Sequence, residues 1–209
     1  MNKLVEIFCD VDDFCRVFIP QWEKQLIADG NIKRKRSCRM TMSEIMTVLI
    51  AFHTSNHRDF KNYYKGYIAK FYRSHFPNLL SYTRFLEVMP KAIVPLSSYF
   101  SILKGEIVDA KLTTGNVHDT KGVDLITTVR SNMKAKAMSL WDRAMLSRRF
   151  IIETINDQLK NISQIEHSRH RSPNGFMLNL LAGLVAYCLK ENKPTLNIND
   201  VEMNVMVSA

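Results

Sequence analysis

The chain has 209 residues, of which 46% are hydrophobic, and this is enough apolar material to bury a core and form one or two domains. Lys and Arg number 29 against 20 Asp and Glu, so the formal net charge is +9 and the isoelectric point is near 9.4. The composition excludes a disordered chain, and the charge favours a polyanionic partner.

The N-terminus does not resemble a secretory signal, because Glu6, Asp10, Asp12 and Asp13 interrupt its apolar stretch. No apolar run approaches the roughly 20 residues that cross a bilayer. The four cysteines show no CxxC spacing, so neither a zinc ribbon nor a disulfide framework is indicated. We therefore expect a soluble intracellular protein.

The first predicted element is an amphipathic helix. Apolar residues recur at helical spacing from Leu4 to Phe18, and Pro20 should end the helix. A short polar segment leads to KRKRSCR, in which five of the seven residues from Lys33 to Arg39 are basic. Such a run is usually a flexible, solvated segment. Here the run precedes two predicted helices in a chain of net charge +9. We therefore favour the alternative interpretation, in which these residues contact nucleic-acid phosphates.

The next helix has the clearest start signal in the chain. TMSE offers Thr41 as N-cap and Glu44 three residues later, a capping box ahead of an apolar stripe. We expect this helix to break near Ser55 and Asn56. Beyond the break, HRDFKNYYKGYIAKFYRSHF interleaves aromatic with basic residues, which predicts a helix with an aromatic face and a basic face.

Two further helices, over residues 81–89 and 92–103, make the first 104 residues all helical. The helices between residues 43 and 89 are candidates for a groove-reading module. The candidate DNA contacts in this half are all basic: Lys33, Arg34, Lys35, Arg36, Arg39, Arg58, Lys61 and Lys65.

The pattern changes at residues 104–105. Short β-type segments at 107–112 and 125–130 predict two strands. The helical period returns over 139–162, and a last helix over 174–190 is apolar on most sides, which predicts burial.

A single carboxylate, Glu153, lies within LSRRFIIETINDQLK on the side opposite the apolar stripe. One interpretation is a solvated face on which Glu153 pairs with Arg149 one turn earlier, and spacing alone favours it. The other is a metal-binding acidic cluster. That cluster needs two further carboxylates, because two divalent ions about 3.5 to 4 Å apart require converging oxygen ligands.

Two pairs of histidines are weaker candidates. His53 and His57 stand four residues apart, but the predicted break between them and the missing third ligand argue against a metal site. His167 and His170 lie among arginines, where phosphate contact and a solvated loop remain equally open.

Two segments of the chain resemble a known family. LSRRFIIETINDQLKNISQIEHSRHRS, followed by NGFMLNLLAGLVAYCL, is similar to the C-terminal end of the DDE transposases encoded by bacterial insertion sequences. SEIMTVLIAFHTSNHRDFKNYY is similar to the helical start of the same family. The resemblance implies an RNase H-like fold in which two Asp and one Glu bind two divalent ions, usually Mg²⁺, for cleavage and transfer of DNA strands.

By position in RRFIIETIN, Glu153 matches the third acid of this family, which implies a catalytic and metal-binding role. Arg148 and Arg149, beside it, are expected near phosphates. The family's two aspartate motifs, which resemble IDST and ADKGY, are absent. The chain passes at 104–106 and at 122–125 directly to what resemble later strands, so two internal segments are missing relative to the family pattern. Asp119 lies in GNVHD, which matches a family turn between the absent aspartates.

We therefore predict an α+β, mostly α protein, with a helical DNA-binding domain over residues 1–104 and a shortened RNase H-like catalytic domain over 105–209. Its expected function is that of an insertion-sequence transposase family protein with an incomplete catalytic site. The alternatives are a non-catalytic regulator that competes at transposon ends, and a decayed gene product. Expected partners are the terminal repeats, target DNA and further copies of the chain, in the cytoplasm at the nucleoid and away from membranes.

Overall fold

The computed structural model describes residues 3–30, 38–55, 57–103, 153–155, 157–162 and 172–193. Every regular element among these residues is a helix, which confirms the prediction of a mostly α protein. The chain divides into two compact units, one of which joins Met1–Glu106 to Gln158–Glu191. We call it the helical unit. The predicted strands at 107–112 and 125–130 lie outside the described residues.

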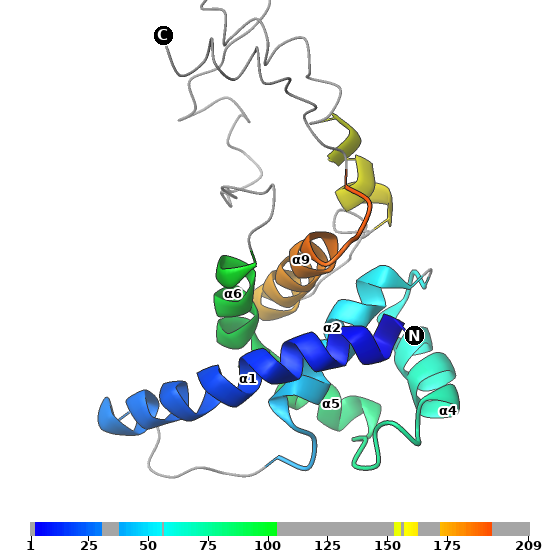
Figure 1. Cartoon of the computed structure of the whole chain (residues 1–209). Helices are drawn as coiled ribbons and strands as arrows, with labels where there is room; N and C mark the ends of the chain where they lie inside the picture. Colours follow the sequence, from blue (N-terminus) through cyan, green and yellow to red (C-terminus); the bar gives the residue numbers. More distant parts are fainter. Residues whose placement is uncertain are drawn as a thin grey trace, which may run out of the picture. The chain divides into compact units, whose positions relative to one another are not determined.

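The first helix, α1 (Lys3–Ala28), begins as predicted but continues through Pro20, so the predicted end was wrong (Figure 1). Proline lacks an N–H and normally weakens a helix interior. Here the apolar stripe continues beyond Pro20, and the rings of Phe18 and Trp22 stack across it with centroids 6.1 Å apart. The buried residues of α1 lie in its first half: Leu4, Ile7, Val11 and Cys15.

The second helix, α2 (Met42–Thr54), starts at the predicted capping box. The Thr41 hydroxyl accepts from the Glu44 N–H at 3.2 Å, and the Thr41 N–H donates to the Glu44 carboxylate at 2.7 Å. Such a cap contributes about 1 kcal/mol. At the other end the Ser55 N–H donates to the Phe52 carbonyl, so the predicted break is confirmed. α2 packs against α1 and α9 and is buried along most of its length.

Residues 60–71 form one helical run, which we call the aromatic-basic helix. Its three parts are α3 (Phe60–Asn62), the π-helix η1 (Tyr63–Ile68) and α4 (Ala69–Phe71). Asp59 caps the run, since its carboxylate accepts from the Asn62 N–H at 2.8 Å.

The aromatic-basic helix has the two faces that the sequence predicts. Tyr63 and Tyr64 are buried, whereas Lys61 and Lys65 are exposed. The Tyr64 ring packs 4.7 Å from that of Phe85, measured between centroids, and its hydroxyl donates to the Leu80 carbonyl at 2.9 Å. The aromatic side therefore anchors the helix in the core and leaves the basic side in solvent.

Three elements follow: α5 (Tyr82–Val88), the 3-10 helix η2 (Met89–Ala92) and α6 (Ile93–Ile102). The two α-helices lie where the sequence predicts them, and Pro95 sits in the first turn of α6, where its missing N–H has no helical partner to lose.

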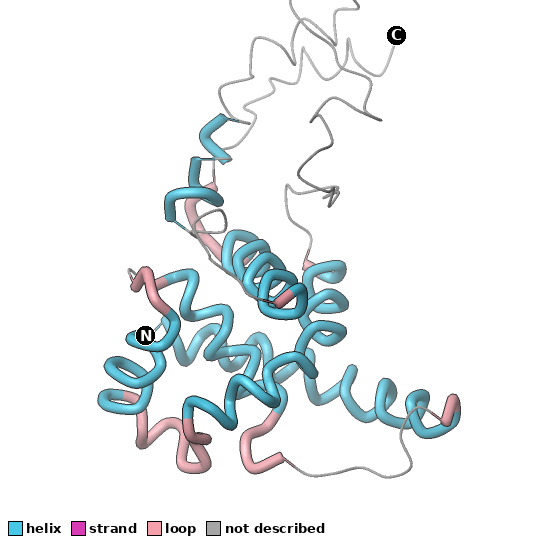
Figure 2. The backbone as a smooth tube through the Cα atoms, turned by 180° about the vertical axis from the view of Figure 1, so that it is seen from behind, coloured by secondary structure: helices cyan, strands magenta, loops and turns pink. Residues whose placement is uncertain are grey.

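The last helix, α9 (Pro173–Cys188), is buried as predicted, and it belongs to the helical unit. Figures 1 and 2 show it beside α6 from opposite sides, and it also packs against α2. The short π-helix η3 (Gln158–Ile162) is tied to its end, because the Lys190 ammonium donates to the Gln158 amide oxygen at 2.9 Å. The predicted domain boundary after residue 104 stays a prediction, but the observed core already includes this later helix.

Candidate nucleic-acid interface

The exposed side of the aromatic-basic helix carries a row of cations. Lys61 and Lys65 stand four residues apart, so they project from the same side of the helix, and Lys70 is exposed near its end. We call these three residues the lysine face. The sequence from residue 60 to residue 75 contains no Asp or Glu, so within this run the cations are offset only by the carboxylate of Asp59, which caps the helix.

Lys65 is held in place by an aromatic ring. Its ammonium lies 5.6 Å from the centroid of Tyr82, within the range of a cation–π contact. Burial and the nearby carboxylate of Asp59 both raise the pKa of the Tyr82 hydroxyl, with burial the larger cause, so the ring stays neutral beneath the lysine. The contact positions the Lys65 charge at the surface and leaves its N–H groups available.

In the part of the chain that the structure describes, no carboxylate forms an ion pair with Lys61, Lys65 or Lys70. Elsewhere in these ranges, ion pairs join Arg16 to Asp12 on α1, at 2.9 Å, and Arg84 to Glu87 on α5. The lysine face therefore differs from an ordinary surface of balanced charges, on which pairs of opposite sign are interspersed.

The structure places four of the predicted DNA contacts. Arg39 is exposed just before the cap of α2, Arg58 is exposed just before Asp59, and Lys61 and Lys65 share the lysine face. Outside the described residues lie the other predicted DNA contacts: Lys33, Arg34, Lys35, Arg36, Arg148 and Arg149.

Two exposed cations, Lys70 and Arg73, were not among the predicted contacts. Both lie in the stretch where basic and aromatic residues alternate, so the pattern that predicted Lys61 and Lys65 as contacts also applies to them. Arg73 also braces the turn before α5, since its guanidinium donates to the Leu79 carbonyl at 3.4 Å.

Aromatic rings pack together on the other side of the aromatic-basic helix, and they include His57, which the sequence argued against as a metal ligand. The His57 ring lies 5.5 Å from Tyr63 and 5.1 Å from Tyr67, measured between centroids. The hydroxyls of Tyr67 and Tyr72 are 3.1 Å apart and hydrogen-bond to each other. Burial raises the pKa of the Tyr63 hydroxyl well above its usual range, and Tyr67 and Tyr72 add to the effect. The Tyr63 hydroxyl therefore stays uncharged behind the lysine face.

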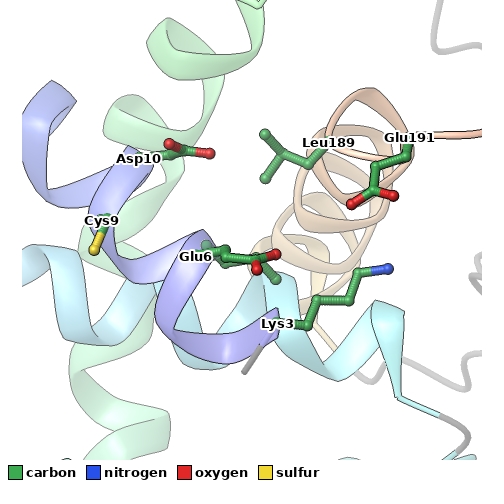
Figure 3. A pocket seen from close by; sticks show the side chains of 7 residues that line it. Lys3, Glu6, Cys9, Asp10, Leu189 and Glu191 are labelled. Carbon is green, nitrogen blue, oxygen red and sulfur yellow. The ribbon is translucent and has the colours of Figure 1, made fainter. Parts of the chain in front are cut away.

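A pocket of about 350 Å³ lies elsewhere in the helical unit, between the start of α1 and the end of α9 (Figure 3). The carboxylates of Glu6, Asp10 and Glu191 line it together with the ammonium of Lys3. Its predominantly negative lining would repel phosphate, so this pocket is not part of the nucleic-acid interface.

Glu153 lies in a helical turn, residues 153–155, and is exposed, as the helical wheel predicts. Asp157 follows four residues later and is also exposed. Within the described ranges, no group of three or more His, Cys, Asp or Glu side chains could hold a metal ion. The catalytic and metal-binding role of Glu153 therefore stays a prediction.

Comparison with known proteins gives a family match for one segment of the chain. Residues 119–173 match the family model described as a transposase DDE domain, a segment that includes Glu153 and covers about a quarter of the 209 residues. The match confirms, for this segment, the resemblance to DDE transposases seen in the sequence. Neither a curated protein nor a solved structure gives a match. No helix in the described ranges is both long and apolar enough to span a bilayer.

Proposed function

We propose that this chain is an insertion-sequence transposase family protein that binds DNA through its helical unit but has an incomplete DDE catalytic site. The family match supports the transposase assignment. The observation that carries DNA binding is the lysine face, an exposed row of cations with no carboxylate in residues 60–75. Both the family match and the lysine face support DNA as the partner.

On this proposal the cations contact phosphates. Lys61 and Lys65 supply the contact from the aromatic-basic helix, and the proposal also includes Arg39, Arg58 and the basic residues at 33–36. Such contacts position a protein on the duplex and make its affinity depend on salt, but they do not read the base sequence. We further propose that the DNA bound is the terminal repeats of the element and target DNA, and that the chain acts there as a homo-oligomer at the nucleoid.

The catalytic half of the proposal concerns residues 105–209, as a shortened RNase H-like domain with Glu153 as the remaining acid. DDE transposase domains generally use a divalent metal, which when bound activates water and stabilises the developing charge on phosphate. Two Mg²⁺ ions need converging carboxylates, and the sequence lacks both aspartate motifs of the family. The residues present do not fit the metal pair, so we assign strand cleavage to intact relatives. The alternative function is competition at transposon ends without strand cleavage. The absence of the two aspartate motifs, together with the presence of the lysine face, favours it.

Neutralising the lysine face should weaken DNA binding in a characteristic way. For the double variant Lys61→Gln and Lys65→Gln, we expect the slope of log affinity against log salt to become shallower by about 1.8, because each phosphate contact contributes about 0.9. Fluorescence anisotropy on a labelled duplex between low and physiological salt measures this slope. The matched control is Lys24→Gln with Lys91→Gln, which removes the same charge from exposed positions on α1 and η2. Equal slopes for the two double variants would contradict the proposed interface.

The incomplete site predicts a null result for chemistry. We expect neither the chain nor Glu153→Gln to cut a labelled duplex that carries the element's terminal repeats, in Mg²⁺ or Mn²⁺, while both bind it with the same affinity. Gel analysis of the products measures cleavage. Cleavage that Glu153→Gln abolishes would show that other carboxylates complete the site.

A further inference from the structure

Gly66 occupies a position where the fold itself has no need of glycine. It lies within η1, is exposed, and a Cβ added there would meet no atom within 4 Å. Its backbone is not left-handed, in contrast to Gly30, which has a φ of 72°. Glycine is the least favourable residue in a helix interior apart from proline, because it loses the most backbone freedom on folding. Steric space and backbone geometry would both accept alanine at this site.

The surroundings of Gly66 suggest what the missing side chain makes room for. Asn62 and Lys70 lie four residues before and after it, and Lys65 precedes it directly; all three are exposed. Gly66 is therefore a gap in the side-chain cover of the helix, set among the cations of the lysine face. Glycine is the usual residue where a backbone and a ligand approach closely, and π-helical segments are frequent at functional sites.

We propose that the sugar-phosphate backbone of duplex DNA makes its closest approach to the protein at Gly66. The inference rests on the proposed DNA binding and adds the point of contact. With no side chain at residue 66, the strand lies against η1, and Lys61, Lys65 and Lys70 reach phosphates on either side. A side chain there would hold the strand away from the helix and lengthen the contacts between ammonium groups and phosphate oxygens. Charge complementarity selects a polyanion, because the face carries cations and the run 60–75 has no carboxylate.

The test compares Gly66→Ala and Gly66→Leu with the unchanged full-length chain, in thermal melts and in anisotropy titrations of a labelled duplex. We expect Gly66→Ala to raise the melting temperature by about 2 to 4 °C, since alanine is the better helix former. We expect Gly66→Leu to bind duplex about tenfold more weakly, the loss of one charge-assisted contact. Ser97→Leu is the matched control, because it adds the same side chain at an exposed position on α6, and it should bind like the unchanged chain.

The outcomes separate the two proposals. If the unchanged chain shows no salt-sensitive binding, the proposed function is overturned, and this inference with it. If the chain binds but Gly66→Leu binds equally well, only the close approach is overturned. A lower melting temperature for Gly66→Ala would show that η1 itself needs glycine, which also overturns the inference. Displacement of the duplex by polyglutamate at equal charge concentration would indicate an acidic protein as the occupant instead of DNA.

Discussion

A fragment that ends at residue 104 should fail to fold, although it contains the whole predicted N-terminal domain. The reason is α9, which closes the core from the other end of the chain. Leu178, Ala182 and Val185 are 2%, 0% and 0% exposed and belong to the same core as α2 and α6. Burial of a Leu or Val side chain contributes about 1.5 to 3 kcal/mol. Loss of α9 therefore removes a large part of a total stability that is typically about 5 to 15 kcal/mol.

Circular dichroism of the 1–104 fragment during urea and thermal unfolding would test this expectation. We expect a weak, non-cooperative transition, and recovery of a cooperative one when a peptide of residues 172–193 is added. The same peptide with Leu178→Asp and Val185→Asp serves as the control and should not restore folding, because a carboxylate cannot be buried without a partner. A cooperative melt of the fragment alone would contradict the role of α9.

Phe85→Ala should lower the free energy of unfolding by about 3 to 5 kcal/mol, the largest effect that we expect from a single substitution. Phe85 is 0% exposed, and its ring lies 4.7 Å from Tyr64 and 5.8 Å from Phe60, measured between centroids. Its removal leaves a cavity beneath the aromatic-basic helix that these tyrosine and phenylalanine rings cannot fill without moving. Urea denaturation followed at equilibrium measures the loss.

Phe71→Ala is the matched control for this prediction. It also deletes a phenyl ring, but from an exposed position at the end of the aromatic-basic helix. Phe71 is 66% exposed, so its removal should change the stability by less than about 0.5 kcal/mol. If both alanine variants lose the same stability, the assignment of buried and exposed sides to this region is incorrect.

Local signals were readable from the sequence because their partners are close in the chain. The box formed by Thr41 and Glu44 is satisfied within one turn, and the break at Ser55 is closed by a carbonyl three residues earlier. Features that depend on distant contacts were not predicted. The packing of α9 against α2 and α6 joins the two ends of the chain in one core, and no local pattern identifies these partners. The continuation of α1 through Pro20 was missed as well, although Phe18 and Trp22, which stack there, lie only one turn apart.

The same distinction applies to the candidate interface. Lys61 and Lys65 could be predicted because alternation of basic and aromatic residues indicates a two-faced helix. Gly66 could not, because its significance depends on two facts about space: the residue is exposed, and a Cβ would meet nothing. The likeness of residues 146–172 to transposases came from recognition of a motif, and helical periodicity alone favoured an ordinary solvated Glu153.

The packing of α9 makes the middle of the chain an insertion within a discontinuous domain. The helical unit is interrupted after Glu106 and resumes at Gln158, so the chain between these points is anchored at both ends to one core. The entropy cost of closing such a loop grows only logarithmically, by about 0.6 kcal/mol for each doubling of length. Both predicted deletion points, at residues 104–106 and 122–125, fall at the start of or within this insertion. A helical core of this kind can carry a long insertion or a short one with little change in its own stability, so a change in the length of the insertion need not alter the lysine face.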